Sequence, residues 1–213
     1  MQYWRLSSFY FSYFAMIGAI VPYWTLYLTS VNFDPIEIGL LASILMGTKV
    51  VSPYLFGWLS DKFQAPVLVI RLTSILSLIS FSFIFMTDSF FGTALVVASF
   101  SFFWNGQIGQ FESITLSRIS NDTSRYGGIR AWGSIGFIVS VLALGFFINM
   151  SGINYLPIFM TVILFLIGLS SLIVNKSDRV VSRNENTSFL NDFLKPTSLL
   201  SSILIHVFGF KSP

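Results

Sequence analysis

Three ionisable side chains lie inside apolar stretches of this sequence and could together bind a polar ligand. Lys49 lies in "GTKVVSP", Glu112 in "GQFESIT" and Arg130 in "YGGIRAWGS". A lysine offers an ammonium group. A glutamate that faces an arginine offers charge-assisted hydrogen bonds, through which the two residues either neutralise each other or hold a polar ligand. Because apolar surroundings make an unpaired charge costly, each of the three is a candidate functional residue.

The composition indicates what surrounds these charges. The 213 residues are 54% hydrophobic and 10% charged, with a mean hydropathy of +0.77, whereas soluble domains carry about 25% charged residues. A helix that crosses the hydrocarbon of a membrane needs roughly 20 apolar residues. Six stretches meet this requirement: 6–31, 36–59, 67–87, 90–116, 129–150 and 155–174. They do not alternate with a period of two, so we predict an all-α bundle of six transmembrane helices.

Charged residues separate between the two sides of this predicted bundle. The side of the N-terminus collects the bases Arg5, Lys62, Arg71, Arg118, Arg125 and Arg130, and the opposite loops hold Asp34, Glu37 and Asp88. An excess of bases marks the cytoplasmic side, so we predict a cytoplasmic N-terminus. The net charge of +3 therefore reflects topology, and the expected surroundings are a lipid bilayer, with no nucleic acid as a partner.

Several kinds of chemistry have little support in the sequence. There is no cysteine, and the one histidine, His206, lies near the C-terminus, so we expect no metal site and no cofactor. No nucleophile, base and third group form a recognisable catalytic set, so we do not expect an enzyme.

The chain changes character after the sixth predicted helix. Residues 1–175 form the predicted bundle, the polar stretch 176–196 reads as a cytoplasmic linker, and 197–213 is a short apolar segment. About 13 apolar residues are too few to span a membrane. This segment is either an interfacial helix or the first part of an incomplete seventh span, and we favour the second because a linker after six helices is where a second bundle would start.

Depth along the helices distinguishes the three charges. At 1.5 Å per residue, Lys49 lies about 18 Å from each end of its helix, too far for its side chain to reach water. We therefore expect Lys49 to face the bundle interior or a watery cavity. The loop that follows the fourth helix places Glu112 and Arg130 at similar depth, although Arg130 could also sit at the membrane interface. Lys49 and Glu112 differ in depth by about 9 Å, so no direct salt bridge between them is expected.

The fourth predicted helix is unusually polar. It carries Asn105, Gln107, Gln110 and Glu112, and a helix exposed to lipid on all sides would not carry them, so one of its faces must line protein or water. Gln107 is a candidate solute ligand. Trp104 could stack on a ligand ring or pack in the core.

The loop after the second helix carries a family motif. "GWLSDKF" resembles the signature G-x-x-x-D-[RK]-x-G-[RK]-[RK] of the major facilitator superfamily, with matches at Gly57, Asp61 and Lys62. Gln64 replaces the second glycine, and the basic pair is absent. The resemblance implies that Asp61 and Lys62 help to latch helix ends in one state of a transport cycle.

The stretch from Glu112 to Gly136 resembles a narrower group. A glutamate followed eighteen residues later by an arginine is similar to the sugar-binding arrangement of lactose permease. "YGGIRAWGS", "PIEIGLLAS" and "VPYWTLYL" are closer to the 3-phenylpropionate transporter group, relatives of the oligosaccharide and nucleoside proton symporters. The resemblance covers about residues 6–174 and implies the N-terminal half of a twelve-helix fold, in which the solute lies between two bundles.

This resemblance implies a secondary transporter in a bacterial inner membrane. The expected solute is a small organic molecule such as an aromatic acid, a sugar or a nucleoside, and the expected coupling ion is a proton. Lys49, Glu112, Arg130, Trp104 and Gln107 are the predicted binding residues. The expected partner is a missing C-terminal bundle or a second copy of the chain. The alternative is a truncated remnant that does not transport, or a six-helix membrane scaffold.

Overall fold

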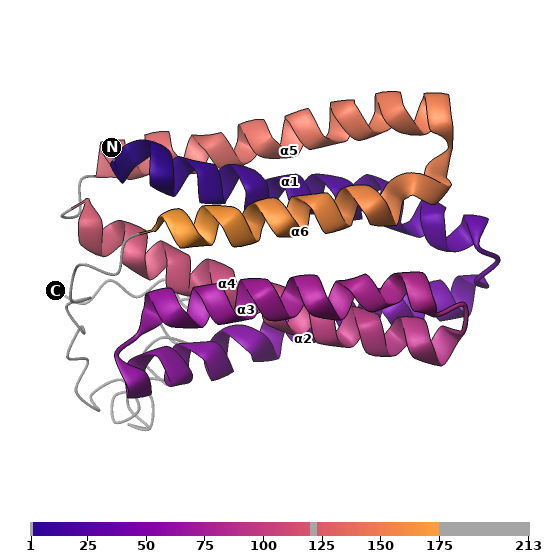
Figure 1. Cartoon of the computed structure of the whole chain (residues 1–213), viewed down its shortest axis with the longest axis horizontal. Coiled ribbons are helices and arrows are strands. Elements are labelled where there is room, and N and C mark those ends of the chain that lie inside the picture. Colours follow the sequence, from indigo (N-terminus) through magenta and orange to yellow (C-terminus); the bar gives the residue numbers. More distant parts are fainter. Residues whose placement is uncertain (1, 120–122, 175–213) are drawn as a thin grey trace, which may run out of the picture. The chain divides into compact units, whose positions relative to one another are not determined.

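The computed structural model describes residues 2–119 and 123–174, which form a bundle of helices (Figure 1). Its helices are α1 (Gln2–Ser30), α2 (Pro35–Phe63), α3 (Pro66–Ser82), α4 (Phe90–Arg118), α5 (Thr123–Ser151) and α6 (Leu156–Ile173), with short 3-10 helices η1 (Phe83–Met86) and η2 (Ile153–Tyr155). The all-α class and the six predicted helices are thus confirmed for this part of the chain. The predicted linker 176–196 and the segment 197–213, with His206, lie outside the described residues.

Local sequence signals set both ends of α2. The Asp34 side chain accepts a hydrogen bond from the backbone N–H of Glu37 at 2.8 Å, and the Glu37 side chain accepts one from the N–H of Asp34 at 3.0 Å. This reciprocal capping box satisfies backbone donors that the first turn leaves free. At the other end, Gln64 takes the left-handed conformation with φ of 50°, which stops the helix.

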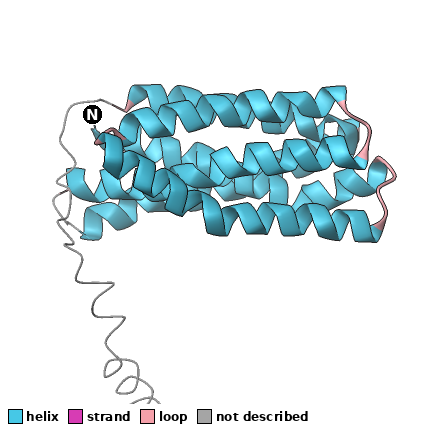
Figure 2. Cartoon of the chain, turned by 90° about the horizontal axis from the view of Figure 1, so that it is seen from below, coloured by secondary structure: helices cyan, strands magenta, loops and turns pink. Residues whose placement is uncertain are grey.

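Helices that are distant in the sequence pack together. α1 packs mainly on α5 and α6, α4 packs mainly on α2 and α3, and α3 also packs on α6. Short connections join consecutive helices at the ends of the bundle (Figure 2). Consecutive helices therefore run in opposite directions, and the end where α1 begins is also where α2 and α4 end and where α3 and α5 begin (Figure 1).

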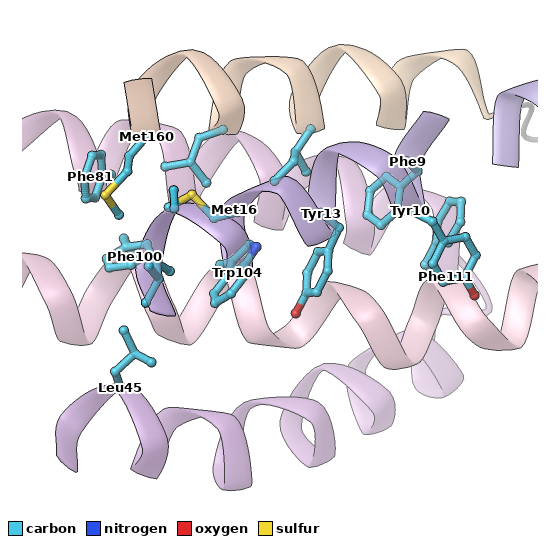
Figure 3. Packing of buried hydrophobic residues seen from close by; sticks show 14 of the residues in the cluster. Phe9, Tyr10, Tyr13, Met16, Leu45, Phe81, Phe100, Trp104, Phe111 and Met160 are labelled. Atoms are coloured by element: carbon cyan, nitrogen blue, oxygen red, sulfur yellow. The ribbon is translucent and has the colours of Figure 1, made fainter. Parts of the chain in front are cut away.

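Aromatic rings join α1 to α4 in the core. Phe9 stacks on Phe111 with ring centroids 3.9 Å apart, and Tyr13 stacks on Trp104 at 5.0 Å (Figure 3). Tyr10 meets the same Phe111 ring edge-on at 5.2 Å. All five side chains are buried. The contact between these two helices is therefore made by large rings and not by close approach of their backbones.

Glycines join α1 to α5 in a different way. The spacing of Gly133 and Gly136 in "WGSIGF" predicts close packing of helices, and the structure confirms it. A Cβ atom on Gly136 would lie 2.2 Å from the carbonyl oxygen of Phe11, and one on Gly18 would lie 2.7 Å from that of Phe137. These two helices approach so closely that backbone faces backbone.

Small polar side chains join α2 to α4. The hydroxyls of Thr48 and Ser101 are hydrogen-bonded at 2.8 Å, and the amide of Asn105 donates to the Thr48 hydroxyl at 3.1 Å. The Ser52 hydroxyl donates to the Phe102 carbonyl. These bonds satisfy polar groups inside a membrane bundle, and they explain why α4 tolerates asparagine at this depth.

The outer surface of the bundle is apolar. Large side chains such as Tyr54, Met86 and Phe91 are at least 80% exposed, a pattern that suits lipid and not water. Five helical segments are long and apolar enough to cross a membrane by length and composition. Within the described residues α4 is the remaining long helix. It is 29 residues long, and its amide side chains Asn105 and Gln107 bond to α2 and α3.

An arginine on α3 caps the C-terminal end of α6. Arg71 donates through Nη2 to the carbonyl oxygens of Leu172 at 3.1 Å and Val174 at 2.8 Å, and its Nε lies 3.4 Å from the oxygen of Ser171. The last carbonyls of a helix have no partner within the helix, and a cation there also interacts favourably with the helix dipole.

Replacing Arg71 with methionine is expected to destabilise the bundle by about 1–2 kcal/mol, because carbonyls at the end of α6 lose a charged donor. Thermal unfolding in detergent measures the change. Leu72→Met alters the neighbouring exposed side chain and serves as the control, which we expect to unfold like the wild type. Equal stability of both variants would contradict a capping role for Arg71.

Candidate functional site

An ion pair between α4 and α5 forms the centre of the candidate site. Nη1 of Arg130 donates to Oε1 of Glu112. The two side chains are 46% and 33% exposed, respectively, so the pair is open on one side. The sequence predicted that these residues lie at similar depth, and the structure brings them into contact.

Two further residues hold Arg130, and neither is among those predicted from the sequence. The Tyr126 hydroxyl accepts a hydrogen bond from Nη1 of Arg130 at 3.2 Å. The guanidinium carbon lies 5.9 Å from the centre of the Phe14 ring on α1, within cation–π range. The four-residue spacing from Tyr126 to Arg130 was a usable signal, because side chains four apart are neighbours on a helix. Nothing in the sequence indicated Phe14.

The ion pair uses only part of its bonding capacity. Both hydrogen bonds of the guanidinium go through Nη1. Among the described residues, Nε and Nη2 of Arg130 and Oε2 of Glu112 have no hydrogen-bond partner. An arginine and a carboxylate can form two parallel bonds, so this single-bond arrangement leaves both donors and an acceptor for another molecule.

Lys49 lies on α2, away from this pair. Its side chain is exposed and makes no hydrogen bond or ion pair with another described residue, so it does not face the interior of this bundle as one of the two expectations had it. That it faces a watery cavity stays a prediction. Its neighbour Thr48 bonds to Asn105, which lies seven residues before Glu112 on α4. Seven residues correspond to about 10 Å along the helix, so the structure agrees with the expected difference in depth. The role of Lys49 in binding stays a prediction.

Trp104 and Gln107 lie in the interior of the bundle. Trp104 is 4% exposed and stacks on Tyr13, while Gln107 is fully buried and donates through Nε2 to Ser77 at 3.4 Å. The structure does not bring these two side chains to the Glu112–Arg130 pair. In this arrangement they pack between helices, and their contact with a solute stays a prediction.

The motif residues after α2 lie at the end of the bundle where α1 begins. Asp61 and Lys62 are exposed, and Nζ of Lys62 lies 4.7 Å from the centre of the Trp58 ring. A Cβ on Gly57 would make an ordinary contact with Gln110 at 3.6 Å. The latching role of Gly57, Asp61 and Lys62 stays a prediction.

Gln64 shows why the motif usually has glycine at this position. Its left-handed backbone is one that glycine adopts without steric cost. The Gln64 side chain donates to the Asp61 carbonyl at 3.2 Å, and this bond offsets part of that cost. The departure from the motif therefore keeps the shape of the turn.

Comparison with known proteins identifies the family. A family model described as the MFS_1 like family matches residues 3–208. The chain belongs to this family, a branch of the major facilitator superfamily. An uncharacterised transporter of Bacillus subtilis, YwbF, is 33% identical over 146 residues, which cover 68% of this chain and 36% of that protein.

Other relatives are also transporters of the major facilitator superfamily. A probable 3-phenylpropionic acid transporter of Escherichia coli is 25% identical over 152 residues, covering 68% of this chain and 38% of that one. A maltose permease of Geobacillus stearothermophilus is 25% identical over 138 residues, covering 64% of this chain and 35% of that one.

The fold matches that of a solved transporter. The crystal structure of the nucleoside transporter NupG superposes with a TM-score of 0.77 at 21% identity, covering 97% of this chain and 52% of that one. The chain thus spans about half of this superfamily structure. Family membership and the apolar helices together make it an integral membrane protein.

Proposed function

We propose that this six-helix unit binds a small organic solute and contributes one wall of the pathway by which a secondary transporter moves that solute across a bacterial inner membrane. The observation that carries the proposal is the half-exposed Glu112–Arg130 pair, which keeps two donors and one acceptor unused. Charged residues inside membrane bundles usually mark solute or ion pathways.

The unused atoms suggest which solute groups fit. A hydroxyl can donate to Oε2 of Glu112 and accept from Nη2 or Nε of Arg130, whereas a carboxylate can only accept. Sugars and nucleosides supply hydroxyls, and the carboxylate of an aromatic acid can accept from Nε and Nη2 of Arg130. Coupling to protons, as in a proton symporter, enters this proposal from the family resemblance alone.

The second wall of the pathway requires a partner. The curated relatives are longer than this chain, which aligns to 36–38% of the first two. Transporters of this fold hold their solute between two bundles. We infer that the described bundle acts with a second one, either a C-terminal bundle or another copy of the chain, and that the base-rich end where α1 begins faces the cytoplasm.

Ligand stabilisation tests the binding function directly. The protein is reconstituted in lipid nanodiscs and unfolded by heat with a nucleoside, a disaccharide or 3-phenylpropionate. A ligand at 100 times its dissociation constant stabilises a protein by about 2.7 kcal/mol. We expect at least one class to raise the unfolding temperature of the wild type and not of Arg130→Leu. No stabilisation by any solute would contradict binding by this bundle and favour a scaffold that does not transport.

Lys49→Gln is expected to separate anionic from neutral solutes. If Lys49 contacts an anionic group, loss of the ammonium weakens carboxylate binding about tenfold, because a charge-assisted hydrogen bond is stronger than a neutral one. Nucleoside or disaccharide binding is expected to change less than twofold. Titration calorimetry with matched solutes measures both affinities. Equal changes for neutral and anionic solutes would contradict the assignment of Lys49.

A further inference from the structure

Arg130 has two hydrogen-bond partners of different kinds. Glu112 comes from α4, whereas Tyr126 lies on α5, one turn before Arg130 itself. α4 and α5 are not among the helix pairs with extensive packing. A movement of α4 relative to α5 would therefore separate Arg130 from Glu112 but not from Tyr126.

The packing of Tyr126 keeps its hydroxyl in place independently of the Glu112–Arg130 ion pair. Its ring is half-buried and packs against the hydrophobic core, so its hydroxyl is held by the ring and not by the ion pair. Phe14 on α1 lies against the guanidinium, and α1 is the helix on which α5 packs most closely. Both contacts belong to the same pair of packed helices, α1 and α5.

A buried hydroxyl lies beside this site. Tyr10 of α1 is fully buried, and the side chains of Thr115, Tyr126 and Glu112 lie close to it. The Tyr126 hydroxyl accepts a hydrogen bond from Arg130 and, as a phenol, also has a proton to donate. It can therefore bond to a second group without releasing Arg130.

We propose that Tyr126 is the positioning residue of Arg130, which keeps the guanidinium at the site when a solute draws Glu112 away. The inference rests on the proposed function, because a solute is what separates the pair. While Glu112 is in place, both partners share Nη1. When Glu112 turns to the solute, Tyr126 and Phe14 still hold Arg130. Its Nε and Nη2 are then positioned to donate hydrogen bonds to the solute.

A double-mutant cycle tests this assignment without any solute. Phenylglyoxal reacts with arginine, and mass spectrometry follows its addition at Arg130 in the full chain in nanodiscs. Glu112→Leu alone is expected to raise the rate about twofold to threefold because Tyr126 still holds the guanidinium. Tyr126→Phe alone is expected to raise it less than twofold because Glu112 remains. The double variant is expected to react at least about tenfold faster, well above the product of the single effects.

Tyr3→Phe is the matched control. The Tyr3 hydroxyl donates to the Gly128 carbonyl at 3.1 Å and accepts from Nε1 of Trp132 at 3.2 Å, so it also joins α1 to α5 but does not touch Arg130. Combined with Glu112→Leu, it is expected to give no more than the product of the single effects. The same excess as with Tyr126→Phe would show general loosening of the helices and overturn the proposal.

A rescue and a solute measurement complete the test. Tyr126→His offers an acceptor nitrogen in place of the hydroxyl. When it is combined with Glu112→Leu, phenylglyoxal is expected to react with Arg130 within about threefold of the rate in Glu112→Leu alone. A rate equal to that of the Glu112→Leu and Tyr126→Phe double variant would overturn the proposal. For a solute that stabilises the wild type, Tyr126→Phe is expected to weaken the affinity of the protein for that solute about fivefold to tenfold. Unchanged affinity would overturn the inference, whereas a wild type that binds no solute would overturn the proposed function and leave the reactivity result standing.

Discussion

Arg130→Lys is expected to weaken solute binding about 10- to 100-fold, although the positive charge is retained. Lysine presents one compact ammonium and cannot reproduce the planar fork whose Nε and Nη2 are unused in the structure. A hydrogen bond to a charged group contributes about 1.5–3 kcal/mol, and 1.4 kcal/mol corresponds to tenfold in affinity. Titration calorimetry in nanodiscs with a solute that stabilises the wild type gives the ratio.

The control for this substitution is Arg5→Lys. Arg5 lies in α1 near the same end of the bundle, and its guanidinium makes no hydrogen bond with another described residue. We expect its affinity to stay within twofold of the wild type. Equal losses in the two variants would mean that replacing any arginine at this end of the bundle weakens binding, and would contradict a specific role for the fork of Arg130.

Gly136→Ala is expected to have the largest effect on stability. The added methyl group would lie 2.2 Å from the Phe11 carbonyl oxygen, which belongs to a helix backbone that cannot move aside without displacing α1. Overpacking of this kind costs about 1–3 kcal/mol. Thermal or denaturant unfolding of the purified protein in detergent measures the loss.

Gly127→Ala is the matched control on the same helix. A Cβ at Gly127 meets no atom within 4 Å, and alanine is the better helix former by about 1 kcal/mol. We therefore expect this variant to be as stable as the wild type or slightly more stable. A loss of stability similar to that of Gly136→Ala would indicate that α5 tolerates no alanine in general. It would contradict the explanation that the Gly136→Ala loss comes from close packing on α1.

The helices and the ion pair could be predicted from the sequence for identifiable reasons. Continuous apolar runs separated by short polar turns define the helices. Because the connection after α4 is short, α5 begins at the end of the bundle where α4 ends and runs in the opposite direction. Glu112, near the end of α4, and Arg130, near the start of α5, therefore had to lie at similar depth. Their contact then required only that both side chains face the same side.

Rotation about each helix axis could not be predicted in the same way. α4 carries polar residues on more than one side, and the sequence does not say that Gln107 turns to Ser77 on α3 while Asn105 turns to Thr48 on α2. Trp104 is buried for the same reason, since its position on α4 places it against Tyr13. Contacts between distant helices, such as that of Phe14 with Arg130, depend on which helices become neighbours.

The pairing of α1 with α5 also has a consequence for how the protein is made. The hydroxyl of Tyr3 bonds to a carbonyl 125 residues further along the chain. At about 5–20 residues per second, the ribosome needs about 6–25 seconds to synthesise that interval. During this time the small-residue face of α1 has no partner in the membrane. A chaperone or insertase that shields this face of α1 until α5 emerges would have that whole interval in which to act.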